Sequence, residues 1–245
     1  MQFTTLNVIL FGISSFLTGL AKTSVGGLGI IIVPLMAMVF PGKESVGVLL
    51  PMLITADIIA VILYRRGTQW KIIARISPFV CAGIAAGAVI LYYLPDINFS
   101  AYIGGVILVM QCIELLDASN KVNLSTRTSL PLTVLTGVLA GMFTMVANAA
   151  GPLMAVYFLQ QRLDKKEFVG TSSMYFLLLN LFKVPFSASL GLITAQSLKM
   201  DLFAVPVIII GAAAGYGFLK LINVTAFRRI IRVLAFAASV KLLFF

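Results

Sequence analysis

The chain contains 245 residues, of which 60% are hydrophobic and only 11% are charged, and its mean hydropathy is +1.08. Soluble domains carry roughly 25% charged residues, so the composition excludes a water-soluble globule and indicates a protein that lies in a lipid bilayer. The net charge of +10 is concentrated in short connections between apolar segments, a placement typical of cytoplasmic loops, so it is no evidence for nucleic-acid binding.

Apolar runs bounded by glycine, proline and charge predict ten helical segments. Those of the first half cover 4–22, 28–40, 45–64, 72–94 and 99–117. Those of the second half cover 129–148, 151–162, 168–190, 202–222 and 227–245. No Lys or Arg precedes Lys22, which argues against a cleaved signal peptide and for a first helix that is retained.

The second segment of each half is short. A helix needs about 20 apolar residues to cross about 30 Å of hydrocarbon, more than either 28–40 or 151–162 supplies. Each follows a longer segment across a break rich in glycine or alanine, SVGGLG at 24–29 and ANAAGP at 147–152. Discontinuous helices of this kind hold the substrate sites of many transporters. We therefore predict two broken, re-entrant hairpins whose tips meet near the midplane.

The two halves share recurring motifs. LTG at 17–19 matches LAG at 139–141, and KESVG at 43–47 matches KEFVG at 166–170. Pro78, Gly83 and Gly87 likewise match Pro206, Gly211 and Gly215, whose glycines would let helix backbones approach closely. Five segments is an odd number, so the second half must enter the membrane from the opposite side. The fold class predicted is an all-α integral membrane protein of two inverted repeats, residues 1–122 and 123–245.

Loop charges give an independent indication of this inversion. The connection at 64–71 is basic, whereas its counterpart at 191–201 carries one Lys and one Asp. The next connection reverses the bias, because the first half carries only Asp96 whereas 220–229 carries three basic residues. By the positive-inside rule, equivalent loops lie on opposite sides of the plasma (inner) membrane and both termini lie outside the cytoplasm.

Three charged residues lie within apolar segments. Lys22 ends the first segment at the break, Asp57 lies in the third, and Lys183 lies in the third segment of the second half. A charge at a helix centre costs about 2.5–3.5 kcal/mol on insertion scales, which favours a functional site over snorkelling or a structural ion pair.

The helices after the two breaks begin with unpaired N–H groups and roughly half a positive charge, which together favour an anion. With the intramembrane lysines, these helix starts predict a pocket for a small anion. The candidate substrate-binding residues are Lys22, Thr23, Ser24, Gly26, Gly27, Gly29, Asn148, Ala149, Gly151, Asn180 and Lys183. The sequence has no His and no CxxC pair, so neither a metal nor another cofactor is expected.

Asp57 aligns with Asn180 of the second half, so one half offers a titratable group where the other offers an amide. Two roles are open for Asp57. It could bind a proton in exchange for the anion, or it could pair with Lys183 when the site is empty.

Several motifs together carry a family resemblance: FLTGLAKTSVGGLGIIIVPL at 16–35, DIIAVILYRR at 57–66, NAAGP at 148–152, KEFVGTS at 166–172 and NLFKVPF at 180–186. In these motifs the chain resembles the sulfite exporter TauE/SafE family of membrane proteins. The resemblance implies export of sulfite or small organosulfonates, linked to the proton gradient.

Other interpretations of the same features are a passive small-anion channel, a transporter of another small anion, or a membrane-embedded enzyme or accessory subunit. The inverted halves favour a transporter over a channel. An enzyme would need a nucleophile with a base, or a metal site, and the sequence offers neither.

Overall fold

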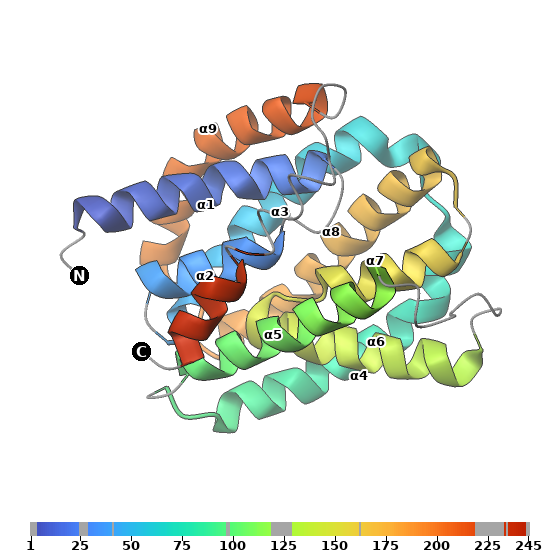
Figure 1. Ribbon diagram of the computed structural model, residues 1–245, viewed down its shortest axis with the longest axis horizontal. Helices are drawn as coiled ribbons and strands as arrows, with labels where there is room; N and C mark the ends of the chain where they lie inside the picture. The colour runs from blue at the N-terminus through green and yellow to red at the C-terminus, as the bar shows by residue number, and fades with distance from the viewer. Residues whose placement is uncertain are drawn as a thin grey trace.

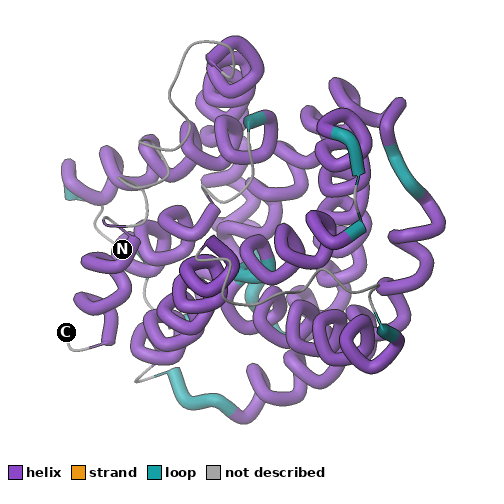
Figure 2. Tube along the Cα trace, turned by 45° about the vertical axis from the view of Figure 1, so that its right-hand side comes forward, coloured by secondary structure: helices purple, strands orange, loops and turns teal. Residues whose placement is uncertain are grey.

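The computed structural model describes residues 4–24, 29–40, 42–96, 99–118, 129–161, 163–218, 233 and 235–243. Within these ranges every regular element is a helix (Figure 2). The labelled helices are α1 (Thr5–Thr23), α2 (Gly29–Val39), α3 (Glu44–Tyr64), the short 3₁₀ helix η1 (Arg65–Gly67), α4 (Trp70–Tyr93), α5 (Phe99–Ala118), α6 (Leu130–Ala147), α7 (Gly151–Gln160), α8 (Lys165–Ser189) and α9 (Ala195–Phe218). Residues 233 and 235–243 are helical as well, and the rest of the tenth predicted segment lies outside the described residues.

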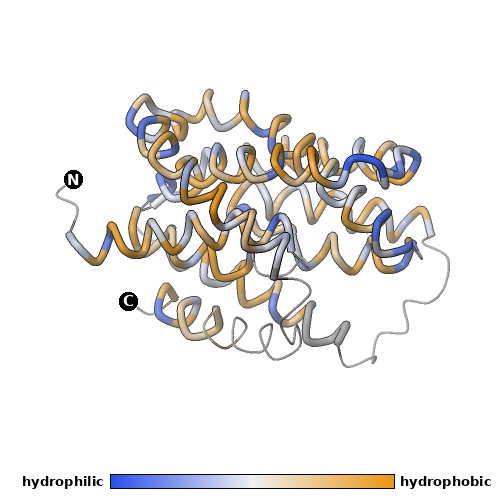
Figure 3. Tube along the Cα trace, turned by 90° about the horizontal axis from the view of Figure 1, so that it is seen from above, coloured by the Kyte–Doolittle hydropathy of each residue, from blue (hydrophilic) through white to orange (hydrophobic). Residues whose placement is uncertain are grey.

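Five helices of the described chain are long and apolar enough to cross a membrane: α1, α3 together with η1, α4, α6 and α9. Apolar residues follow these helices along their lengths (Figure 3). An all-helical chain with several spans of this kind has the architecture of an integral membrane protein.

Two helices begin three or more residues earlier than the sequence predicts, and local capping explains both. α8 begins at Lys165 rather than 168, because the Asp164 carboxylate accepts a hydrogen bond from the Glu167 N–H at 2.7 Å and the Glu167 carboxylate accepts one from the Asp164 N–H at 3.1 Å. α9 begins at Ala195 rather than 202. There the Thr194 and Ser197 hydroxyls each accept a hydrogen bond from the other residue's N–H, so Lys199 and Asp201 lie inside the helix.

The α1–α9 pair and the α4–α6 pair lie on opposite sides of the molecule, with α2, α3, α7 and α8 between them (Figure 1). Glycines let the helices of each pair touch through their backbones. A Cβ at Gly19 of α1 would collide with the Ile208 carbonyl of α9, and a Cβ at Gly211 would collide with the Phe16 carbonyl. The packing role predicted for the glycines of the fourth segments is therefore confirmed at Gly211.

The α4–α6 pair makes the same contacts. A Cβ at Gly141 would collide with the Val80 carbonyl, and a Cβ at Gly83 would collide with the Val138 carbonyl. Val138 corresponds to Phe16 along the two halves, and Val80 corresponds to Ile208. The glycine contacts of the α1–α9 pair and of the α4–α6 pair are therefore made by corresponding residues of the two halves.

The short helices α2 and α7 have 11 and 10 residues, so they extend only about 15–16 Å. Both lie inside the helix assembly, where α2 contacts α1, α3, α5 and α7. The rings of Phe11 on α1 and Phe40 just after α2 meet edge to face, with centroids 6.0 Å apart. Since α2 begins only a few residues after α1 ends, this contact means that α2 runs back along α1.

The central helices α3 and α8 are antiparallel, because the start of each approaches the end of the other. A Cβ at Gly47 would collide with the Leu192 carbonyl after α8, and a Cβ at Gly67 would collide with the Lys166 carbonyl at the start of α8. This packing brings Asp57 and Asn180 together at the middle of the pair.

The end of this pair that carries the basic 64–71 connection is also hydrogen-bonded. The Gln69 N–H donates to the Thr171 hydroxyl at 2.9 Å, and the Gln69 side-chain amide donates to the Glu167 carboxylate at 2.6 Å. The Thr68 hydroxyl donates to the Gly170 carbonyl at 3.3 Å. These bonds join residues about 100 positions apart, and so hold the first half to the second.

Candidate functional site

Five of the predicted site residues, Lys22, Asp57, Asn148, Asn180 and Lys183, form one polar cluster at the centre of the α3–α8 pair. Asp57 and Lys183 are fully buried, and Asn180 is 2% exposed. Lys22, at the end of α1, keeps 17% of its side chain exposed. The structure therefore brings together the three charged residues that the sequence places inside apolar segments.

In the first part of the cluster, Asp57 forms an ion pair through one carboxylate oxygen and accepts a hydrogen bond through the other. The Lys22 ammonium lies 2.7 Å from Asp57 Oδ1. The Asn180 side-chain amide donates to Asp57 Oδ2 at 2.7 Å. The Lys22 ammonium also lies over the ring of Phe176, 4.4 Å from its centroid. Asp57 is thus paired with Lys22, and pairing with Lys183, the second role left open by the sequence, is not the contact observed.

In the second part of the cluster, Lys183 reaches the break between α6 and α7. Its ammonium donates to the Thr144 hydroxyl at 3.2 Å and to the Asn148 side-chain carbonyl. The amide nitrogen of Asn148 in turn donates to the Val46 carbonyl on α3 at 3.1 Å. Both partners of Lys183 are neutral, so no carboxylate compensates its charge through a direct contact within the described residues.

The backbone at Asn148 ends α6 and turns the chain toward α7. Asn148 adopts a left-handed conformation with φ 52°. The Asn148 N–H donates to the Thr144 carbonyl and the Ala149 N–H donates to the Phe143 carbonyl, a capping arrangement that favours glycine or asparagine at this position. The same residue therefore shapes the break and holds Lys183.

Lys22 and Thr144 occupy corresponding positions of the two halves, 122 residues apart. Each lies near the end of the long helix that precedes a break. Lys22 carries its own ammonium to that place, whereas Thr144 receives the ammonium of Lys183. Each break is thus provided with one positive charge, from α1 in one half and from α8 in the other.

The remaining predicted site residues lie around the two breaks. Thr23 is fully buried, and its hydroxyl donates to the Ala212 carbonyl of α9 at 2.8 Å, a contact that holds α1 to α9. The hydroxyl oxygen of Ser24 is buried and has no hydrogen-bond partner among the described residues. Ala149 is 6% exposed. Gly26 and Gly27 lie outside the described residues.

Gly29 and Gly151 are the first residues of α2 and α7. A Cβ at Gly151 would meet no heavy atom within 4 Å, so the start of α7 has open space beside it. The first N–H groups of a helix have no partner within the helix and attract negative charge. This start lies next to Asn148 and therefore near the Lys183 ammonium.

Sequence reasoning missed Thr144 and Phe176, which contact the two ammonium groups. Thr144 had a signal, because it stands where the repeat places Lys22. Phe176 had none, since aromatic residues are common in apolar helices and its contact with Lys22 depends on how α1 packs against α8.

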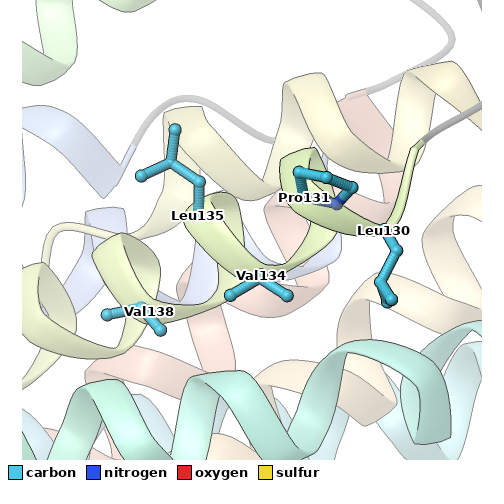
Figure 4. A pocket seen from close by; sticks show the side chains of 5 residues that line it. All are labelled: Leu130, Pro131, Val134, Leu135 and Val138. Carbon is cyan, nitrogen blue, oxygen red and sulfur yellow. The ribbon is translucent and has the colours of Figure 1, made fainter.

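A pocket of about 480 Å³ lies elsewhere, on the outer face of α6 (Figure 4). Its lining residues are Leu130, Pro131, Val134, Leu135 and Val138. Leu130 is 60% exposed and Leu135 is 57% exposed. A wholly apolar lining offers no donor for an anion and is suited to lipid chains.

A family model described as sulfite exporter TauE/SafE matches residues 11–242, nearly the whole chain and all of the polar cluster. Comparisons with curated proteins and with solved structures gave no match. With this match and its apolar spans, the chain is a multi-pass membrane protein that belongs to the sulfite exporter TauE/SafE family.

Proposed function

We propose that this protein exports small sulfur-containing anions, such as sulfite or organosulfonates, across the cell membrane in a proton-coupled manner. The single observation that carries the proposal is Lys183, a fully buried ammonium whose hydrogen-bond partners are neutral. A buried charge without a counter-charge is costly in a membrane protein. An anion bound at Lys183 removes that cost.

The surroundings of Lys183 support an anion site. The start of α7 lies beside Asn148, and Gly151 leaves space there for a ligand to approach the backbone. Helix N–H groups and an ammonium together bind oxyanions well. Family membership supports sulfur oxyanions as the substrates and supports transport over enzymatic catalysis.

The proposed transport cycle uses two inverted repeats, residues 1–122 and 123–245, with re-entrant hairpins formed by α1–α2 and α6–α7. The glycine contacts that exchange with the halves support the repeats. The return of α2 along α1 supports the first hairpin. Alternating access then moves one half against the other around a site between them.

The sidedness proposed places both termini outside the cytoplasm and the 64–71 connection inside it. The basic residues of that connection support this orientation. The hydrogen bonds of Thr68 and Gln69 to α8 would then close the cytoplasmic end of the α3–α8 pair. Opening toward the cytoplasm requires these bonds to break.

The test is uptake of labelled sulfite and of a small alkylsulfonate into proteoliposomes, comparing the wild type with Lys183→Ala. A charged hydrogen bond contributes about 1.5–3 kcal/mol, so we expect Lys183→Ala to raise the half-saturation concentration roughly 10–150-fold. Lys43→Ala is the matched control, because Lys43 pairs with Asp96 at 3.8 Å at a helix end away from the site. An unchanged half-saturation concentration in Lys183→Ala would contradict an anion site at Lys183. Passive flux that does not saturate would indicate a channel.

A further inference from the structure

We propose that the site carries one unit of net positive charge, so that a monoanionic sulfonate binds alone whereas a dianionic oxyanion binds together with one proton on Asp57. This inference rests on the proposed function and narrows its proton coupling to dianionic substrates, so that monoanionic organosulfonates move without a proton. It also makes proton and anion move together, in place of the exchange that the sequence left open.

Asp57 faces a donor group at each of its two carboxylate oxygens. Its Oδ1 faces the Lys22 ammonium at 2.7 Å, and its Oδ2 accepts from the Asn180 amide nitrogen at 2.7 Å. Both neighbours are donors at these contacts, so neither oxygen faces an acceptor for a carboxylic acid proton. This geometry fits an ionised carboxylate, whose charge would neutralise that of Lys22.

Lys183 has hydrogen-bonding capacity left for a ligand. An ammonium has three N–H donors, and two of them are used by Thr144 and Asn148. Within the described residues no partner is recorded for the third. Both acceptors are neutral, so in the proposed charge state the Lys183 ammonium offers one positive charge and one further donor to a ligand.

The helices packed against α3 are α1, α2, α8 and α9, and they determine which other charges lie near Asp57. α1 supplies Lys22, α8 supplies Asn180 and Lys183, and α2 carries no ionisable residue between Gly29 and Val39. On α9, Gly215 packs against the end of α1 beside Lys22. Lys199 and Asp201 precede Gly215 by at least 14 residues, a distance of about 21 Å along the helix. On the connection after α3, η1 places Arg65 and Arg66 two turns beyond Asp57.

Two ammonium groups and one carboxylate therefore leave a net charge of +1 in a buried site. A monoanion brings this charge to zero while the Lys22–Asp57 pair stays intact. A dianion would leave an excess negative charge, which burial penalises. A proton on Asp57 removes that excess and frees Lys22 to bind the second negative charge, so the dianion and the proton enter the site together.

The experiment measures proton uptake when anions bind to the purified full chain in lipid nanodiscs, in weak buffer with a pH indicator. The probes are methanesulfonate, a monoanion, and thiosulfate, a dianion, neither of which changes charge near neutral pH. We expect no proton uptake with methanesulfonate and one proton per bound thiosulfate. Thiosulfate affinity should fall about tenfold per pH unit in the alkaline range, the dependence of a one-proton linkage.

The variant Asp57→Asn adds a second arm, because it replaces the carboxylate with a neutral amide and leaves Lys22 without its counter-charge. We expect it to bind thiosulfate without proton uptake and without pH dependence. Proton uptake with methanesulfonate, equal uptake with both anions, or uptake that persists in Asp57→Asn would overturn the inference. If neither anion binds the wild type, or if Lys183→Ala binds both as the wild type does, the proposed function itself fails. If Asp57→Asn does not fold, the comparison of proton uptake between the two anions in the wild type tests the inference by itself.

Discussion

At the scale of single residues, Asn148 combines a backbone role with a side-chain role. Its left-handed φ of 52° ends α6, its side-chain carbonyl accepts from Lys183, and its amide nitrogen donates to the Val46 carbonyl. A non-glycine residue without a local hydrogen bond pays about 1–2 kcal/mol to adopt this conformation. Asparagine accepts the conformation more readily than most residues and still presents an amide to the ammonium.

The two roles can be separated with Asn148→Gly and Asn148→Ala. Both variants lose the amide, so we expect both to lose anion affinity to a similar extent, by roughly 10-fold or more, since one acceptor of a buried ammonium is gone. Only alanine also carries the backbone strain, so Asn148→Ala should be less stable than Asn148→Gly by about 1 kcal/mol. Thermal unfolding and anion titration of both proteins provide the measurements. Equal stability of the two would show that the left-handed backbone is not retained.

The buried polar cluster could be predicted only in part from the sequence. Lys22, Asp57 and Lys183 stand out because an isolated charge in an apolar run is visible without any tertiary information. The partner of each charge was not visible. Asp57 pairs with Lys22 from α1, and Lys183 binds Thr144 from α6, because helix packing decides which side chains meet.

At the scale of helices, close backbone contact through glycine joins α1 to α9 and α4 to α6. Lipid tails give no hydrophobic drive for two apolar helices to associate, so packing and short contacts must supply the stability. A glycine in such a contact cannot be enlarged without moving a helix. A glycine on the same helix that faces open space can.

Helix α1 contains one glycine of each kind. A Cβ at Gly19 would collide with the Ile208 carbonyl, whereas a Cβ at Gly12 would meet nothing within 4 Å. We expect Gly19→Ala to lower stability by about 1–3 kcal/mol, or roughly 2–12 °C in Tm. Gly12→Ala should leave Tm unchanged or raise it slightly, because alanine is the better helix former. Thermal melts of the two variants in detergent test this, and a similar Tm for both would exclude tight packing at Gly19.

Most helix positions were predictable because apolar runs and their breaks are local features of the chain. α3 begins and ends within one residue of the predicted segment 45–64. α9 differs more, since the charges of Lys199 and Asp201 resemble a loop but the Thr194–Ser197 cap begins the helix before them. A buried Asp201, which is 6% exposed, could not be inferred from those charges.

At the scale of the whole molecule, the proposed orientation follows from the distribution of basic residues between the two sides. Arg65 and Arg66 form η1 at one end of the α3–α8 pair. α1 begins at the other end, since its last residue, Thr23, accepts a hydrogen bond from Tyr64 beside η1 at 2.8 Å. An N-terminus outside and η1 inside are therefore parts of one prediction.

Single cysteines in a protein that lacks Cys81 and Cys112 test this orientation. We expect Thr4→Cys to react with a membrane-impermeant maleimide in intact cells, and Arg66→Cys to react only after the membrane is opened. Positive charge favours the cytoplasmic side, so in intact cells only Thr4→Cys should react. Labelling of Arg66→Cys in intact cells would show that the orientation is the opposite of the one proposed. The hydrogen bonds of Gln69 would then lie at the outer end of the α3–α8 pair.

The sequence by itself determined that this protein lies in a lipid bilayer, and it determined the extent of most of its helices, its two breaks and its three intramembrane charges. Those properties follow from hydropathy and charge along the chain, and each can be recognised within a window of about 20 residues. Tertiary structure alone decided the pairing of Lys22 with Asp57, the contact of Asn180 with the same carboxylate and the neutral partners of Lys183. Asn180 lies 123 residues from Asp57, and only the packing of α3 against α8 determines that their side chains touch.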